Sequence, residues 1–312
     1  MAKVSIIGAG NVGATTAYFI AKQNIADVVL VDVVEGMPQS KANDFLQVSG
    51  SLGLDCGIHG TNDYAEIADS DVVVHTAGIP RKPGMDRMDL LKTNVGIAKT
   101  AAQQIRRYAP RAIIVGVANP LDVICMVLYR ESGFDIRRVV GMAGVLDSTR
   151  FQYFMAEKLG GWPGDAKAMV LGGHGDSMVP VSAYTSYAGF GTDELLDDAT
   201  VEALANRTKT GGGEIVKHLK TGSAYYAPAA SVAKMAEGMI TDRKRICAAS
   251  AYLRGEYGYH DVFLGVPVKL GTNGVEEIYE LPLSAEQKSA LDSSAEHVAE
   301  GVKTLESIYS VG

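Results

Sequence analysis

The first half of the chain alternates short apolar runs with longer stretches in which apolar residues recur at helical spacing. Five runs are rich in β-branched residues and apolar almost throughout, which is typical of strands covered on both faces. They span residues 3–7, 28–32, 72–76, 112–117 and 138–142, and helical candidates lie between them at about 11–24, 35–50 and 87–109. Because strands alternate with helices, the pattern predicts an α/β fold with a doubly wound, Rossmann-type parallel sheet.

The pattern changes after about residue 145. We expect a helix over residues 148–159, a strand over 167–171 and a mostly helical region over 193–257. The two strands of a hairpin are expected over 262–269 and 274–279. A closing helix begins at Ser284, whose spacing from Gln287 suits a capping box. The chain is long enough for two domains, and the change of pattern predicts residues 1–145 and 146–312, the second of α+β type.

Composition and charge argue against several classes of protein. The 312 residues are 47% hydrophobic and 21% charged, as in an ordinary soluble globular protein. A net charge of −7 without a basic run argues against nucleic acid as a partner. We find no run of about 18 apolar residues for a membrane helix, and the start lacks the features of a signal peptide. Cys56, Cys125 and Cys247 form no CxxC pair, which argues against disulfides and a metal site and favours the cytoplasm.

A glycine-rich segment, Gly8-Ala9-Gly10-Asn11-Val12-Gly13, follows the first predicted strand and opens the first helix. It fits GxGxxG, which is a weak motif alone, but Asp32 at the end of the second strand completes the context of a dinucleotide site. The glycines permit a tight turn and a close approach to the pyrophosphate, which the helix N-terminus faces. A carboxylate at Asp32 bonds ribose hydroxyls and repels a 2′-phosphate, so NAD is favoured over NADP.

Further polar residues lie near predicted strand ends, where doubly wound folds bind their ligands. Asn119 follows the fourth strand, and Asp147 and Arg150 are three apart near a predicted helix start, so they share a face. Taken alone, that pair is more typical of an N-cap with an intrahelical ion pair. His174, in the segment LGGHGDS, stands between glycines that offer little side-chain cover, which is unusual for a core histidine.

Five segments come in the order seen in the lactate/malate dehydrogenase family, which the chain resembles over essentially its whole length. They are GAGNVG with Asp32, AGIPRKPGMDR, VANP, GVLDSTR and GGHGDSMVP. The resemblance implies an NAD-binding domain over residues 1–145 and a substrate domain over residues 146–312. The first two segments are similar to malate dehydrogenases of the lactate-dehydrogenase-like bacterial type, which are usually homotetramers and sometimes dimers.

The resemblance implies a role for each matching residue. His174 is expected to be the general acid/base that exchanges a proton with the C2 oxygen of malate or oxaloacetate, and Asp147 to orient its ring. Arg150 is expected to clamp the C1 carboxylate with paired hydrogen bonds, and Asn119 to bond the reacting oxygen. Beyond the glycine-rich segment and Asp32, the implied cofactor contacts are Asn94, Val117, Ala118 and Asn119.

The segment from Gly78 to Arg87 has two prolines, two glycines and four charges, which by composition alone is typical of a plain surface loop. It resembles the family's lid over bound substrate. Arg87 matches the arginine that polarises the reacting carbonyl. Arg81 matches the position where malate dehydrogenases carry arginine and lactate dehydrogenases glutamine. A covered Arg81 pairs with the distal carboxylate of malate, and leaving it unpaired costs about 3–5 kcal/mol.

The function predicted is therefore NAD-dependent, reversible oxidation of (S)-malate to oxaloacetate. Three alternatives stay open: a dehydrogenase of lactate or another 2-hydroxy acid, a non-catalytic NAD sensor, and an NADP-preferring enzyme. Arg81 argues against the first, His174 with Asp147 and Arg150 against the second, and Asp32 against the third. Assembly into homo-oligomers is indicated only indirectly, by the apolar residues of the predicted helix near 35–50.

Overall fold

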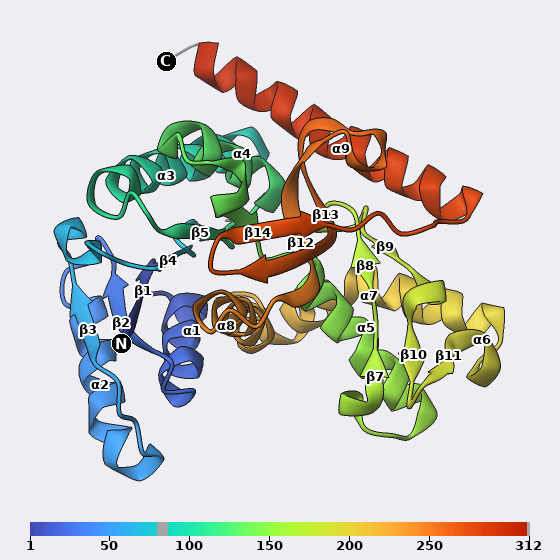
Figure 1. Ribbon diagram of the computed structural model, residues 1–312, viewed down its shortest axis with the longest axis horizontal. Coiled ribbons are helices and arrows are strands. Elements are labelled where there is room, and N and C mark those ends of the chain that lie inside the picture. Colours follow the sequence, from blue (N-terminus) through green and yellow to red (C-terminus); the bar gives the residue numbers. More distant parts are fainter. Residues whose placement is uncertain (80–86, 311–312) are drawn as a thin grey trace. The chain divides into compact units, whose positions relative to one another are not determined.

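Figure 1 shows the computed structural model, which describes residues 1–79 and 87–310. The described chain forms two compact units. Unit 1 comprises Met1–Met142, Tyr225–Arg245 and Lys269–Glu277, whereas unit 2 comprises Ala143–Ala224, Ile246–Val268 and the chain from Ile278 onward. The first change between units falls at Met142/Ala143, and the functional division of the chain at 145/146 stays a prediction.

Unit 1 is built on a parallel sheet whose six strands lie in the order β3-β2-β1-β4-β5-β6. The strands are β1 (Ala2–Ile7), β2 (Ala26–Val31), β3 (Ile58–Thr61), β4 (Val72–His75), β5 (Ile113–Gly116) and β6 (Val139–Gly141). Their side chains are mostly buried, as the nearly continuous apolar runs predicted. This strand order is that of the doubly wound Rossmann fold, so the predicted fold class is confirmed.

Helices cover both faces of this sheet, with α1 and α8 packed together on one face and α3 and α4 on the other (Figure 1). The helices of unit 1 are α1 (Asn11–Lys22), α2 (Met37–Leu52), α3 (Arg87–Tyr108), α4 (Leu121–Ser132) and α8 (Tyr226–Ile240). Helix α8 belongs to unit 1 although it comes from the second half of the chain, and its apolar face packs on α1.

The carboxyl ends of four neighbouring strands are level with one another. Ile7 is in register with Val31 on one side and with His75 on the other. His75 is in turn in register with Gly116. The first residues beyond these strand ends therefore share one edge of the sheet: Gly8, Asp32, Thr76 and Val117. Ligands of doubly wound folds bind at this edge.

Unit 2 mixes helices with short strands. Besides most of the two longer strands β12 (Arg245–Arg254) and β13 (His260–Gly271), it contains α5 (Gly144–Leu159), β7 (Ala166–Lys167), β8 (Val170–Leu171), β9 (Val179–Pro180), β10 (Ser186–Tyr187), β11 (Phe190–Gly191), α6 (Thr192–Leu195), α7 (Asp198–Leu219) and α9 (Ala285–Ser310). Strand β8 pairs antiparallel with β9, and β11, β10 and β7 form a small sheet. Phe151, Phe154 and Leu204 join α5 to α7 in a buried apolar cluster.

The closing helix forms as predicted. The Oε1 of Gln287 accepts from the backbone N–H of Ser284, and the Oγ of Ser284 accepts from the backbone N–H of Gln287, which completes the capping box. Leu291 and Leu305 on its apolar stripe are fully buried. The predicted late hairpin is also present, as β13 (His260–Gly271) and β14 (Gly274–Ile278).

Two predictions of secondary structure were wrong in part. Residues 193–257 were expected to be mostly helical, but Arg245–Arg254 forms strand β12 beside β13. Its alanine-rich sequence has little intrinsic strand preference, so tertiary pairing decides its conformation. The strand expected over 167–171 is two short strands, β7 and β8, separated by two residues. Within the described residues, none of the helices is long and apolar enough to cross a membrane.

Candidate active site

The glycine-rich turn between β1 and α1 depends on close backbone contacts. Gly8 has φ +105°, and a Cβ there would lie 2.7 Å from the Oγ1 of Thr76. A Cβ on Gly13 would lie 1.8 Å from the carbonyl oxygen of Gly8, so only glycine lets α1 start this close to the strand end. A Cβ on Gly10 would meet nothing within 4 Å, since this glycine faces open space. These are the geometries that a dinucleotide fingerprint requires.

The N-terminus of α1 opens at this turn. The first helical bond runs from the N–H of Ala14 to the carbonyl of Gly10, so the N–H groups of Asn11, Val12 and Gly13 have no acceptor within the helix. Gly10 is the N-cap and provides no side-chain cap. Such a helix end suits an anion, because unpaired N–H groups and the helix dipole both favour negative charge.

Asp32 ties the turn to the neighbouring strand. Its Oδ2 accepts a 2.7 Å hydrogen bond from the backbone N–H of Ala9, and its Oδ1 accepts one of 3.0 Å from Val34. The Oγ1 of Thr76 donates to the carbonyl oxygen of Gly8 at 2.9 Å. The carboxylate therefore fixes the backbone of the turn as well as facing the pocket beside it.

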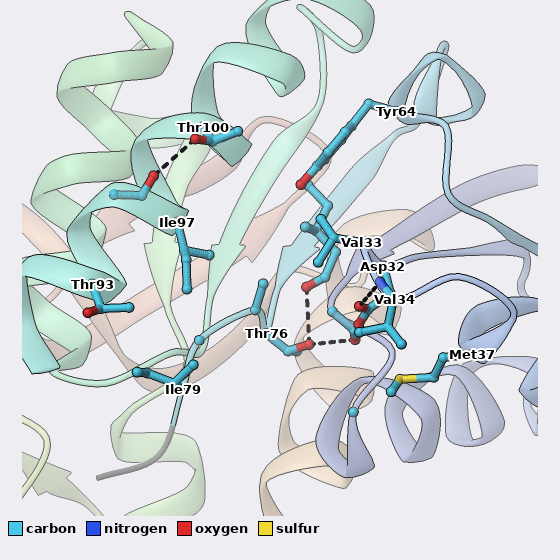
Figure 2. Close-up of a pocket in the computed structure, with 16 residues that line it drawn as sticks. Asp32, Val33, Val34, Met37, Tyr64, Thr76, Ile79, Thr93, Ile97 and Thr100 are labelled. Atoms are coloured by element: carbon cyan, nitrogen blue, oxygen red, sulfur yellow. Dashed lines mark hydrogen bonds between the residues drawn. The ribbon is translucent and has the colours of Figure 1, made fainter. Parts of the chain in front are cut away.

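That pocket has a volume of about 590 Å³ and lies wholly in unit 1 (Figure 2). Of the residues predicted for the cofactor, its lining includes Gly8, Gly10 and Asp32. Sequence reasoning missed several further lining residues: Val33, Val34, Met37, Tyr64, Thr76, Ile79, Thr93, Ile97 and Thr100. Burial and the charge of Asp32 raise the pKa of Tyr64, in keeping with its place at the same pocket. A mainly apolar lining with one carboxylate fits an adenine dinucleotide.

Asn94 is hydrogen-bonded to the backbone of Ile79, one of the residues that line this pocket. It is 2% exposed, its Nδ2 donates to the carbonyl of Asn119 at 2.9 Å, and its Oδ1 accepts from the N–H of Ile79 at 2.9 Å. A Cβ on Gly78, which lines the pocket, would lie 3.3 Å from both Asn94 and Ala118. Asn94 thus holds together the segments that follow β4 and β5.

The residues after β5 stand at the predicted edge of the sheet. The N–H of Val117 donates to the carbonyl of His75 at 3.0 Å, which continues the ladder beyond the strand. Ala118 is buried, whereas Asn119 is exposed. Arg81 lies outside the described residues. Arg87 is the first residue of α3, and its side chain also lies outside the described structure.

Unit 2 brings three of the predicted residues together. The buried carboxylate of Asp147, in the first turn of α5, is 2% exposed. Its Oδ2 lies 2.9 Å from the Nδ1 of His174, and its Oδ1 accepts a 3.2 Å bond from the Nη1 of Arg150. Alone, the ion pair between Asp147 and Arg150 would suit a plain helix start. The same carboxylate also contacts His174, 27 positions further along the chain. A carboxylate near a helix N-terminus is also favoured by the helix dipole.

The loop that carries His174 is fixed on both sides. Gly172 exchanges backbone bonds of 2.8 and 3.1 Å with Gly265 of β13. The N–H of Gly173 donates at 2.8 Å to the Oγ of Ser294, a fully buried residue of α9. The same hydroxyl lies 3.2 Å from the Oγ of Ser177, at the other end of the loop. Ser294 therefore holds both ends of the turn, a contact that no local sequence signal indicated.

The comparisons agree with this geometry. Residues 2–141 match the model of the lactate/malate dehydrogenase NAD-binding domain, and residues 144–308 match that of the alpha/beta C-terminal domain of the same family. The chain belongs to the lactate/malate dehydrogenase family. NAD, the cofactor predicted from the sequence, is thereby confirmed.

Relatives within this family match over nearly the whole chain. A malate dehydrogenase of Chlorobium phaeobacteroides is 54% identical over 310 residues, with 99% of this chain and 100% of the relative covered. One of Methanosarcina mazei is 51% identical, with 98% and 100% covered. Among solved structures, a malate dehydrogenase of Salinibacter ruber has a TM-score of 0.95 at 47% identity and covers 99% of each chain.

A lactate dehydrogenase of Cryptosporidium parvum, solved with lactic acid and nicotinamide adenine dinucleotide, is similar as well. Its TM-score is 0.94 at 40% identity, and 98% of each chain is covered. The fold is therefore common to malate dehydrogenases and lactate dehydrogenases, and it does not show which of the two substrates an enzyme uses.

Proposed function

We propose that this protein is an NAD-dependent malate dehydrogenase that reversibly oxidises (S)-malate to oxaloacetate. The observation that carries the proposal is the carboxylate of Asp147, which is within hydrogen-bonding distance of both His174 and Arg150. This arrangement joins a general base to a carboxylate-binding cation. The names of the relatives at 50–54% identity support malate as the substrate.

His174 acts as the general acid/base. With its Nδ1 proton donated to Asp147, the Nε2 nitrogen is the basic one, and it takes the proton of the C2 hydroxyl as malate is oxidised. Asp147 stabilises the imidazolium that results. In the reverse direction the imidazolium returns this proton to the carbonyl oxygen of oxaloacetate. An imidazole serves both directions because its ordinary pKa, about 6.5, lies near neutrality.

Arginines and an amide hold the substrate. Arg150 binds the C1 carboxylate, which suits the planar fork of donors on a guanidinium. Asn119 and Arg87 bond the reacting oxygen, and the charge of Arg87 polarises the carbonyl in the reductive direction. Arg81 pairs with the distal carboxylate, the group that malate has and lactate lacks. The roles of Arg81 and Arg87 are proposed from the sequence alone.

Unit 1 supplies the cofactor site. When bound there, NAD would supply the acceptor for the hydride that leaves C2 of malate, and NADH the donor in the reverse direction. The residues proposed to hold it are Gly8 to Gly13, Asp32, Asn94 and Val117 to Asn119, within a functional NAD-binding domain of residues 1–145; residues 146–312 form the substrate domain. The open space at Gly10 and the carboxylate of Asp32 in the pocket support this assignment. Asn94 contributes by holding the backbone of Asn119.

The proposal is tested by comparing kcat/KM for oxaloacetate and pyruvate with NADH, and for oxaloacetate with NADH and NADPH. We expect oxaloacetate and NADH to be preferred. A preference for pyruvate would establish the lactate dehydrogenase that the Cryptosporidium relative suggests, and equal rates with NADPH would remove the role of Asp32. A His174→Asn variant that is as active as the wild type would rule out His174 as the base. No turnover at all would favour the NAD sensor.

We also propose that the enzyme works in the cytoplasm, in the tricarboxylic acid cycle, of which this reaction is a step, and that it is a homotetramer or a homodimer. Helix α2 supports self-association, because Leu46, Val48 and Leu52 are exposed on it at 45%, 36% and 40%. Sedimentation equilibrium of the whole protein decides the oligomeric state. A monomer at micromolar concentration would contradict the proposal.

A further inference from the structure

Helix α7 contains three consecutive glycines, Gly211, Gly212 and Gly213, well inside its 22 residues. Glycine destabilises a helix interior relative to alanine, because its backbone loses more freedom on folding. Three in a row are therefore unfavourable to the helix itself. A run of this kind needs a reason in the packing of the helix against its neighbours.

The three glycines face different surroundings. A Cβ on Gly213 would meet nothing within 4 Å, and that residue is exposed. A Cβ on Gly211 would lie 3.2 Å from the ring of Phe154 and 3.5 Å from the Cδ of Arg150, in the aliphatic part of that side chain. A Cβ on Gly212 would lie 3.3 Å from the Nη2 of Arg150 and 3.7 Å from its Cζ and Nη1. Gly212 thus leaves room for one particular group, the guanidinium of Arg150.

Two contacts confine Arg150. The Nη1 atom donates to Asp147, whose other oxygen faces His174, and the side chain is only 15% exposed. The bare backbone at Gly212 lies close to the same guanidinium. A guanidinium confined in this way loses less freedom when it binds a carboxylate, and its fork of donors keeps a fixed direction.

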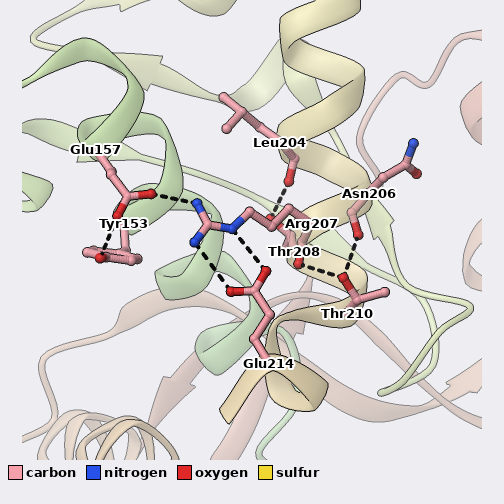
Figure 3. A network of polar contacts seen from close by, with 8 residues as sticks. All are labelled: Tyr153, Glu157, Leu204, Asn206, Arg207, Thr208, Thr210 and Glu214. Atoms are coloured by element: carbon pink, nitrogen blue, oxygen red, sulfur yellow. Dashed lines mark hydrogen bonds and ion pairs between the residues drawn. The ribbon is translucent and has the colours of Figure 1, made fainter. Parts of the chain in front are cut away.

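A polar cluster joins α7 to α5 (Figure 3). Arg207 of α7 donates to Glu157 of α5 at 2.5 Å and to Glu214 at 3.0 Å, and its guanidinium lies 4.0 Å above the ring of Phe154. These partners raise the pKa of Arg207, and Arg207 holds the pKa of Glu157 below its ordinary value. Together with the buried apolar contacts between α5 and α7, the cluster holds the two helices together, so we expect a side chain added at Gly212 to displace the end of Arg150 rather than α7.

We propose that Gly212 is a positioning residue for substrate binding: its missing side chain sets where the guanidinium of Arg150 lies, and thereby the affinity for the carboxylate beside the reacting carbon. The inference rests on the proposed role of Arg150. A methyl group at Gly212 displaces the flexible end of Arg150 by a few tenths of an ångström and leaves the fold intact. Clamps of this kind are sensitive to small displacements.

The test compares Gly212→Ala with Gly213→Ala, its neighbour on the open side of the helix. Both substitutions replace a helical glycine by alanine, so both are expected to raise Tm or leave it unchanged. We expect Gly212→Ala to raise KM for oxaloacetate roughly three- to tenfold and leave KM for NADH unchanged, because only the carboxylate clamp moves. Gly213→Ala is expected to leave both KM values at the wild-type level.

An Arg150→Gln variant and the double variant with Gly212→Ala separate the possible failures. If Arg150→Gln has the wild-type KM for oxaloacetate, the proposed role of Arg150 is wrong, and the inference falls with it. If Arg150→Gln raises that KM but Gly212→Ala behaves like Gly213→Ala, only the inference is overturned. It is overturned too if Gly212→Ala lowers Tm and raises both KM values, or if its effect persists without Arg150. A double variant identical to Arg150→Gln supports it.

Discussion

The Nδ1 of His174 lies 2.9 Å from the Oδ2 of Asp147, and the second oxygen of this carboxylate accepts a bond from Arg150. One buried side chain therefore determines the direction of both the proposed base and the proposed substrate clamp. Since a carboxylate can only accept hydrogen bonds, it requires the proton of the neutral imidazole to lie on Nδ1. A change at Asp147 is expected to affect proton transfer and substrate binding together.

The substitution Asp147→Asn tests this coupling. An amide can donate to the imidazole as well as accept, so the ring loses its fixed tautomer and the imidazolium its charged partner. We expect kcat to fall by roughly 10²- to 10⁴-fold, the usual contribution of general acid/base catalysis, and KM for oxaloacetate to rise as Arg150 loses its partner. Steady-state kinetics measures both constants. Asp165→Asn, an exposed carboxylate of unit 2, is the control, and a kcat near that of the control would contradict the prediction.

The parts of this site differ in how far the sequence reveals them. The spacing of Asp147 and Arg150 places them on one helix face, so that contact could be predicted from the residues alone. His174 was identified by its glycine neighbours and by the family resemblance, but no local pattern indicates what its ring contacts. The bond from Gly173 to Ser294 joins residues 121 positions apart, and only the packing of α9 brings them together.

Ser294 provides a second prediction. Ser294→Ala leaves the buried N–H of Gly173 without its acceptor, at a cost to folding of about 1–3 kcal/mol. The loop that bears His174 then has more freedom, and we expect kcat to fall roughly threefold or more, with KM for NADH unchanged. Ser293→Ala is the matched control, because the exposed Ser293 hydroxyl bonds only to the carbonyl of Ser289 within α9 in the described structure. If Ser294→Ala lowers Tm but leaves kcat intact, the bond serves stability alone.

Some elements of the fold can likewise be predicted from their local sequence, whereas others depend on contacts between distant segments. The strands of unit 1 follow from their apolar runs because a covered parallel strand needs no other pattern. Helix α4 was not identified, since it is buried nearly all round from Leu121 to Leu128, and a short apolar run does not distinguish a buried helix from a buried strand. Strand β12 was taken for helix because alanine and serine fill its centre, from Ala248 to Ala251, and neither composition nor periodicity indicates that it pairs with β13. Periodicity also could not show that α8 packs on α1.

Arg81 gives a prediction that rests on the sequence and on the chemistry of the proposed substrate. Arg81→Gln removes the cation proposed to pair with the distal carboxylate, so we expect kcat/KM for oxaloacetate to fall roughly 100-fold or more. The value for pyruvate is expected to rise, because no charge is then left unpaired. Lys82→Gln, the neighbouring cation, is the control. An unchanged ratio of the two substrates in Arg81→Gln would remove Arg81 from substrate selection.

His75 is a buried histidine at the end of β4 that the proposed chemistry does not use. Its side chain is 0% exposed, and neither ring nitrogen has a hydrogen-bond partner among the described residues. Burial lowers the pKa of His75 to about 4 from an ordinary 6.5. The unfolded chain therefore binds a proton that the folded chain excludes, over the range from pH 6.5 down to pH 4. Its contribution to stability is present above pH 6.5 and is lost as the pH falls through that range.

A pKa shift of this size corresponds to a total change of about 3 kcal/mol in the free energy of unfolding. About 2 kcal/mol of it is lost between pH 7 and pH 5. We expect His75→Leu to remove this part of the acid sensitivity, because leucine fills much of the same space and cannot take up a proton. Urea denaturation at pH 7 and pH 5 measures the effect as the change in midpoint between the two pH values. His59→Gln, at an exposed histidine of β3, is expected to keep the wild-type dependence. If His75→Leu loses as much stability as the wild type on acidification, the acid sensitivity arises in other groups, and His75 is not excluded from protonation in the folded protein.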